Sequence, residues 1–83
     1  MNVTLPPRTP VDLYAATGIT VGAQLRVSNI ATTDVRLSTT EDGLVDDHVP
    51  ITVYEQAVNN AGDVGAWASA AQLGGAVNVV EVV

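Results

Sequence analysis

The sequence predicts an all-β fold, a small antiparallel β-sandwich or jelly-roll-like barrel of about six or seven strands. Valine, isoleucine and threonine occupy 27 of the 83 positions, and these β-branched side chains favour the pleated surface of a strand. Leucine is scarce, and no stretch carries the spacing of apolar residues that marks an amphipathic helix. Glycine and proline interrupt the chain at short intervals, as expected between short strands.

The first ten residues contain three prolines and predict an extended N-terminal arm, residues 1–10, ahead of a single domain over residues 11–83. Within this arm, residues 2–5 form a short predicted strand in which Val3 and Leu5 face the same side. We expect such an arm to reach across a neighbouring subunit, where it adds a strand or fills a groove.

The strands of the domain follow from apolar runs between turn residues. In the first of them Val11, Leu13 and Ala15 point inward by alternation. The fourth opens with Pro50, which a strand tolerates at its first position. The fifth is the least strand-like, because its alanines also suit a helical turn. The predicted strands cover residues 11–16, 23–30, 34–39, 50–57, 64–71 and 76–82.

The strands at 23–30 and 34–39 predict a hairpin, because a short connection separates two regular alternations of apolar and polar residues. The facing pairs are then Val27 with Val35, Leu25 with Leu37, and Arg26 with Arg36. Directly opposed like charges are destabilising, so the two arginines need compensation. Solvent together with an acid such as Asp12 or Glu55 supplies it in one interpretation. A carboxylate on a neighbouring subunit or partner supplies it in the other.

The C-terminal segment, residues 76–83, contains five valines that fall on both faces of its predicted strand. Val77 and Val79 share one face, and Val80 and Val82 share the other. A solvated edge strand of this composition promotes aggregation, so we expect the strand to be central in its sheet or covered by another subunit. The small size of the chain and its lack of cysteine favour an oligomer.

The charge balance excludes several classes of partner. Three arginines and no lysine stand against nine acidic residues, which gives a formal net charge of −6. Binding to nucleic acid or to an anionic membrane surface relies on clustered lysine and arginine, so neither is expected. No apolar run approaches the roughly 18 residues of a membrane span, and no signal-peptide pattern opens the sequence.

No catalytic constellation is recognisable, so we predict a protein that is not an enzyme and that uses no cofactor or metal. His48 is the single histidine, and no cysteine or nucleophile motif accompanies it, so we expect an exposed loop residue. The carboxylates between residues 41 and 47 lack the spacing of a calcium loop. They predict a solvated acidic loop, with weak binding of a divalent cation as the alternative.

Trp67 is the largest apolar side chain in a sequence that has no phenylalanine, so we expect it to pack in the core. The alternative is an exposed tryptophan that binds the face of a sugar. Alanines flank Trp67, whereas carbohydrate platforms usually combine several aromatic residues with polar neighbours.

Five segments resemble small virion proteins that are encoded among the structural genes of tailed bacteriophages. They are residues 11–19 (VDLYAATGI), 21–30 (VGAQLRVSNI), 34–38 (DVRLS), 61–68 (AGDVGAWA) and 74–79 (GGAVNV). The resemblance extends over most of the chain, and residues 40–60 depart furthest from it. It implies a β-sandwich or jelly-roll-like structural subunit that folds in the host bacterial cytoplasm and resides in the virion. Disulfides are not formed in that compartment, which agrees with the absence of cysteine.

The function expected from this resemblance is that of a capsid decoration or cement protein that binds the assembled shell and stabilises it. Its partner would be the major capsid protein or another virion protein, and it would form a homo-oligomer, with a trimer favoured. The alternatives are a tail, collar or fibre-attachment component and a carbohydrate-binding module for host surfaces. The candidate interface residues are Val3, Leu5, Pro6, Pro7, Arg8, Arg26, Arg36, Val80 and Val82.

Overall fold

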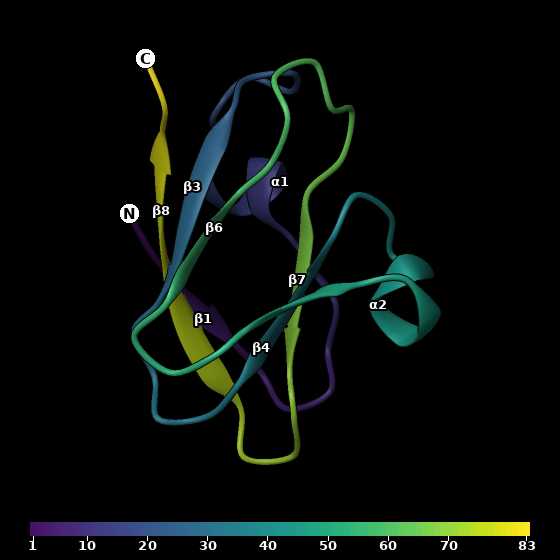
Figure 1. Cartoon of the computed structure of the whole chain (residues 1–83), viewed down its shortest axis with the longest axis vertical. Coiled ribbons are helices and arrows are strands. Elements are labelled where there is room, and N and C mark those ends of the chain that lie inside the picture. The colour runs from purple at the N-terminus through teal and green to yellow at the C-terminus, as the bar shows by residue number, and fades with distance from the viewer.

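The computed structural model describes residues 1–83 and contains two antiparallel sheets of four strands each, packed face to face (Figure 1). Sheet A has the strand order β1-β8-β3-β6, and sheet B has the order β2-β7-β4-β5. The strands of sheet A are β1 (Asn2–Leu5), β8 (Gly75–Glu81), β3 (Leu25–Asn29) and β6 (Gln56–Val58). Those of sheet B are β2 (Val11–Asp12), β7 (Trp67–Ala70), β4 (Val35–Ser38) and β5 (Val49–Ile51). The predicted all-β sandwich is therefore confirmed.

The core lies between the two sheets and is built from alternate side chains of their strands. In sheet A, for example, Val27 of β3 lies opposite Val79 of β8, and both are buried. The helix α1 (Leu13–Thr17) adds Leu13 and Tyr14. Burial of one valine or leucine side chain contributes about 2 kcal/mol. The buried cluster consists of Val3, Leu5, Leu13, Tyr14, Leu25, Val27, Val35, Leu37, Ile51, Ala66, Ala68, Ala70, Val77 and Val79.

The predicted hairpin between residues 23–30 and 34–39 is wrong, because β3 and β4 belong to opposite sheets. β3 pairs with β6 and β8, and β4 pairs with β5 and β7. The chain crosses between the sheets at Asn29, whose side chain is buried. The Asn29 Nδ2 donates to the carbonyl of Thr33 (2.8 Å) and to that of Ile51 in β5 (2.9 Å). These bonds satisfy a buried amide and tie the two sheets together.

Arg26 and Arg36 consequently do not oppose each other. Arg26 lies on the outer face of sheet A between valines of β6 and β8. Arg36 lies on the outer face of sheet B between Pro50 and Ser69. Because the two cations are on different sheets, the predicted repulsion between them does not arise. Neither a nearby acid nor a carboxylate on a partner is needed to compensate for it.

The predicted strand over residues 11–16 is also wrong beyond its first two residues, since α1 follows β2 directly. The Asp12 Oδ1 accepts hydrogen bonds from the backbone N–H groups of Tyr14 (3.0 Å) and Ala15 (3.3 Å), which caps the helix at its start. Gly18 ends the helix in the left-handed conformation, with φ of 75°. The capping residues thus favour a helix over the strand that the short alternation of apolar residues predicted. Ala15, which was predicted to point inward, is exposed.

The predicted strand over residues 50–57 is two strands in different sheets. β5 ends at Ile51 and β6 begins at Gln56. Between them, the backbone N–H of Glu55 donates to the carbonyl of Thr52 (3.0 Å) and closes a turn. The other predicted strands, 23–30, 34–39, 64–71 and 76–82, correspond to β3, β4, β7 and β8 with ends that differ by at most three residues.

The predicted acidic loop contains the short helix α2 (Gly43–Asp46), which packs against β4 and β7. Its Leu44 is buried and anchors the segment, while Glu41, Asp42 and Asp46 are exposed. The structure contains no helix that is long and apolar enough to cross a membrane.

The two ends of the chain lie next to each other in sheet A. β1 pairs with β8, and Val3 and Leu5 point into the core, so the predicted common face of these two residues is confirmed. The extended N-terminal arm is not confirmed, since residues 2–5 are an integral strand of the sheet. β8 lies between β1 and β3, which confirms the expectation of a central strand.

Candidate functional site

The predicted interface residues occupy three different places in the structure. Val3 and Leu5 lie in the core and present no surface to a partner. Arg26 and Val80 are neighbours on the outer face of sheet A. Val82 follows β8 and is half-buried, and its backbone N–H donates to the carbonyl of Gln24 (2.8 Å). Pro6, Pro7, Arg8 and Arg36 lie apart from these residues: the first three follow β1, and Arg36 belongs to β4 in sheet B.

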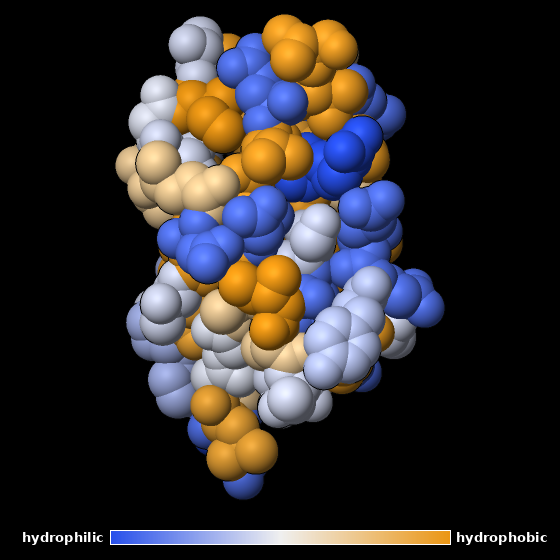
Figure 2. All heavy atoms as spheres, turned by 90° about the vertical axis from the view of Figure 1, so that its left-hand side faces the viewer, coloured by the Kyte–Doolittle hydropathy of each residue, from blue (hydrophilic) through white to orange (hydrophobic).

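The outer face of sheet A alternates apolar and polar rows across its strands. Arg26 lies between Val58 and Val80 in one row. The next row is polar: the Ser28 Oγ donates to the Gln56 Oε1 (3.4 Å), and the Asn78 Nδ2 donates to the Asn2 Oδ1 (2.8 Å). Figure 2 looks onto this side of the molecule and shows apolar side chains on both sides of a polar band.

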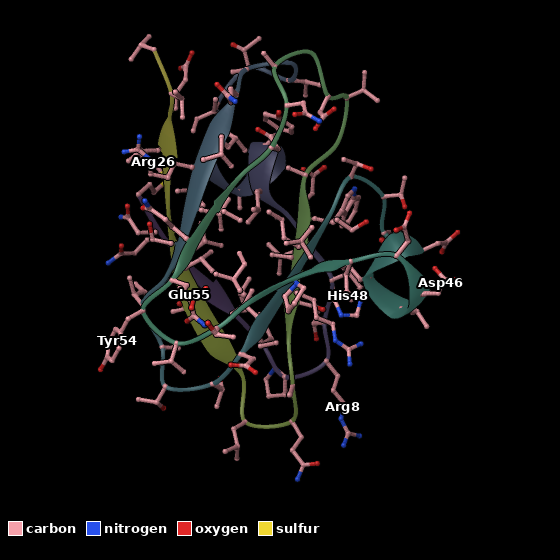
Figure 3. All side chains as sticks on the ribbon, in the orientation of Figure 1. Arg8, Arg26, Asp46, His48, Tyr54 and Glu55 are labelled. Carbon is pink, nitrogen blue, oxygen red and sulfur yellow. The ribbon has the colours of Figure 1, made fainter.

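Ile30 and Tyr54 extend this face at the end where β3 stops and β6 begins. The backbone N–H of Asn29 donates to the carbonyl of Glu55 (2.9 Å), which brings the residues after β3 beside those before β6. Ile30 is exposed, and 83% of the Tyr54 surface is accessible. Figure 3 shows Tyr54 and Arg26 projecting from the same side of the molecule.

Tyr54 has an unusual backbone conformation for its residue type. Its φ of 64° lies in the left-handed region, and it is the third residue of the turn closed by Thr52 and Glu55. That position of a turn favours glycine when φ is positive. The strained backbone of Tyr54 lowers the stability of the fold, and an exposed side chain contributes little packing energy to offset that cost. Such strain is often found at functional sites, so Tyr54 is a candidate for contact with another molecule.

We define the face A surface as Arg26, Ile30, Tyr54, Val58 and Val80. It combines a tyrosine and an arginine, two residue types that are enriched in protein interfaces, with three exposed aliphatic residues. Of these five residues, the sequence singled out Arg26 and Val80. The others were not found because their exposure depends on where each strand ends and pairs.

The structure also corrects the expectations for His48 and Trp67. His48 is half-buried rather than exposed, and its buried Nδ1 has no hydrogen-bond partner. Trp67 lies outside the core cluster and is half-buried on the outer side of β7. Its neighbours Ala66 and Ala68 point inward instead, because side chains alternate along a strand and these small residues allow the sheets to approach closely.

No cluster of three or more histidine or acidic side chains is arranged to hold a metal ion. The outer face of sheet A is composed of apolar, amide and guanidinium groups. In comparisons with known proteins, no family model, no curated protein and no solved structure matches this chain.

Proposed function

We propose that the protein is a non-enzymatic structural subunit of a tailed-bacteriophage virion, and that it serves as a capsid decoration protein. The face A surface is the observation that carries the binding role, since exposed apolar residues lie beside Arg26 and beside Tyr54, on either side of a polar row. Tyrosine and arginine supply much of the affinity in protein interfaces, and clustered exposed apolar groups mark contact surfaces.

The assignment to a virion is supported by the resemblance of five segments to small structural proteins of tailed phages. One of these segments, residues 21–30, contains Arg26 and Ile30 of the face A surface. The segment 74–79 supplies most of β8, the central strand beneath that surface. The other three residues of the surface, Tyr54, Val58 and Val80, lie outside the five segments, so the resemblance supports the virion role and the structure alone supports the choice of surface.

The proposed mechanism is stabilisation by binding. A protein that binds the assembled shell and not its separate subunits shifts the equilibrium toward the shell by mass action. Repetition over a symmetric particle multiplies the effect of a small contact surface. The partner in this proposal is the major capsid protein, the decoration protein itself is a trimer, and neither nucleic acid nor membrane takes part.

The test of this proposal is the location of the chain in purified phage particles. Particles encoded by the same genome would be purified by density gradient, analysed by mass spectrometry and imaged by electron cryomicroscopy. We expect the chain in many copies per particle, with density at the joints between major capsid subunits.

Two results would overturn the assignment. Absence of the chain from particles would remove the virion role. Density restricted to the tail, collar or fibre base would replace the capsid role with that of a tail component. The solution mass of the purified chain, measured by light scattering, tests the trimer separately, and a monomer at all concentrations would exclude it.

A further inference from the structure

A groove of about 690 Å³ lies on the other side of the molecule, over the outer face of sheet B. Its floor includes Ser69 and Ala70 of β7. Leu44 and Val45 of α2 line it, together with Leu73 from the turn between β7 and β8. Figure 3 shows Arg8 on this side, below α2 and away from Arg26.

The backbone of Arg8 is attached to β7, and its exposed side chain makes one hydrogen bond within the lining of the groove. It has a φ of 53° in the turn closed by the bond from the Thr9 N–H to the Pro6 carbonyl (3.3 Å). Its backbone N–H donates to the carbonyl of Ala70 (3.1 Å), which attaches the turn to β7. Its Nη2 donates to the Gln72 Oε1 (2.9 Å). A non-glycine residue rarely adopts this conformation, so the surrounding bonds hold Arg8 where it is.

Arg36 also lines the groove and is anchored differently. It projects from the outer face of β4, and its Nη1 donates to the carbonyl of Leu44 in α2 (3.2 Å). Both guanidinium groups are thus held by neutral oxygen atoms. An arginine has five N–H donors, so most of the donors on each group stay available to a ligand.

The distribution of charge makes this arrangement informative. The chain has three cations and nine acidic residues, yet two of the three cations line one groove. Glu41 is the single acidic residue in the lining. A guanidinium group is suited to bind carboxylates, because its planar fork matches two carboxylate oxygens.

The apolar part of the lining limits the kind of ligand. Leu73 is 81% exposed and Val45 is 77% exposed, so both present apolar surface beside the arginines. A groove of this volume is larger than a single carboxylate or phosphate ion needs. A long polyanion such as nucleic acid is disfavoured by the net charge of −6, because the repulsion grows with the number of anionic groups, whereas a short segment needs only two carboxylates to pair with the two arginines.

We propose that this groove binds an extended acidic segment of a partner protein. Its carboxylates pair with Arg8 and Arg36, and its apolar side chains contact Leu73 and Val45. This inference is independent of the virion role, because it rests on the groove alone and is tested on the isolated protein.

The test uses a fluorescein-labelled hexapeptide in which glutamate and valine alternate, with both ends blocked. Binding to the full chain is measured by fluorescence anisotropy. The matched peptide carries glutamine in place of glutamate and keeps the length and the apolar side chains. We expect saturable binding of the acidic peptide and an affinity for the glutamine peptide that is at least about tenfold weaker.

Variants of the three arginines complete the test. Arg8→Gln and Arg36→Gln should each weaken binding of the acidic peptide by about fivefold or more, because each removes a charge from the groove. Arg26→Gln removes the same charge from the opposite sheet and should leave binding unchanged. Circular dichroism and the urea midpoint show whether each variant remains folded, and Arg8→Lys provides a milder substitution if Arg8→Gln is unfolded.

Several results would overturn the inference. Equal binding of the two peptides would show that charge plays no part, and an equal loss in Arg26→Gln would show that the groove is not the site. Absence of saturable binding would exclude the acidic segment as ligand. Complete competition by inorganic phosphate at a concentration that a chloride control does not match would assign the groove to small anions instead.

Discussion

The outer faces of the two sheets arise from the same alternation of side chains but offer different surfaces. On sheet A no helix covers the strands, and Tyr54 and Arg26 project beside aliphatic residues (Figure 1, Figure 3). On sheet B, α2 and the turn that contains Arg8 border a groove. This difference comes mainly from two connecting segments that border sheet B, namely α2 and the turn that contains Arg8, and less from the strands. A chain of 83 residues thus presents the face A surface on one sheet and a groove lined by two arginines on the other.

Loss of the link between the sheets should have the largest effect and should abolish both surfaces together. Asn29→Ala removes three side-chain hydrogen bonds: the Nδ2 donates to the carbonyls of Thr33 and Ile51, and the Oδ1 accepts from the Ala31 N–H (2.9 Å). The bond to Ile51 is buried, so its acceptor is left unpaired away from water. We expect a loss of about 3 kcal/mol in the free energy of unfolding, measured by urea denaturation.

The matched control for this variant is Ser28→Ala, the adjacent residue on the outer face of the same strand. Its hydroxyl bonds to Gln56 at the surface, so its removal should cost about 0.5 kcal/mol or less. Similar losses in the two variants would show that Asn29 does not join the sheets in the way described.

A second prediction separates the two surfaces by function. Tyr54→Ala should weaken binding to the assembled shell by about 30-fold, because an aromatic residue in an interface can contribute about 2 kcal/mol. The same variant should leave binding of the acidic peptide unchanged. Arg36→Gln should produce the reverse pattern. Surface plasmon resonance with immobilised shells and anisotropy with the peptide provide the two measurements, and parallel losses in both assays would contradict two independent surfaces.

The third prediction concerns the cost of the Tyr54 backbone conformation. Tyr54→Gly should be about 1 kcal/mol more stable than Tyr54→Ala, because glycine adopts a φ of 64° without steric strain. Both variants remove the ring and should lose the same shell binding. Thermal and urea unfolding compare the pair, and equal stability would mean that the turn does not hold this residue in the left-handed region in solution.

The smallest expected effect is a partial protection of the Trp67 side chain, which belongs to β7 in sheet B, from a fluorescence quencher. Because the indole is half-buried, acrylamide should quench its fluorescence to an extent between those of a free and a fully buried tryptophan. Full protection would place Trp67 in the core after all. Protection that appears only when simple sugars are added would support the carbohydrate-binding alternative.

The sequence predicted which strands exist better than it predicted how they pair. β3 and β4 alternate apolar and polar residues in the same way whether they pair within one sheet or face each other across the core. Only the crossover at Asn29 decides between these arrangements, and its two acceptors depend on the tertiary fold. The prediction of one strand over residues 50–57 was wrong for the same reason, because the turn between β5 and β6 takes the chain from sheet B to sheet A.

The candidate surfaces were harder to predict than the strands. Arg26 and Val80 could be assigned to an outer face from alternation alone, and the structure makes them neighbours. Arg8 and Arg36 are far apart in sequence, and no sequence motif indicates that both line one groove. Val3 and Leu5 were assigned to an interface because the proline-rich segment suggested an arm, whereas pairing of β1 with β8 places them in the core.

In the proposed function, the protein binds an assembled phage shell through the face A surface. The most direct measurement is co-sedimentation of the chain with shells assembled from the major capsid protein of the same genome. The native chain should sediment with the shells to saturation, and the double variant Ile30→Asp with Tyr54→Ala should remain in the supernatant while still folded. Equal sedimentation of both proteins, or of neither, would contradict the claim.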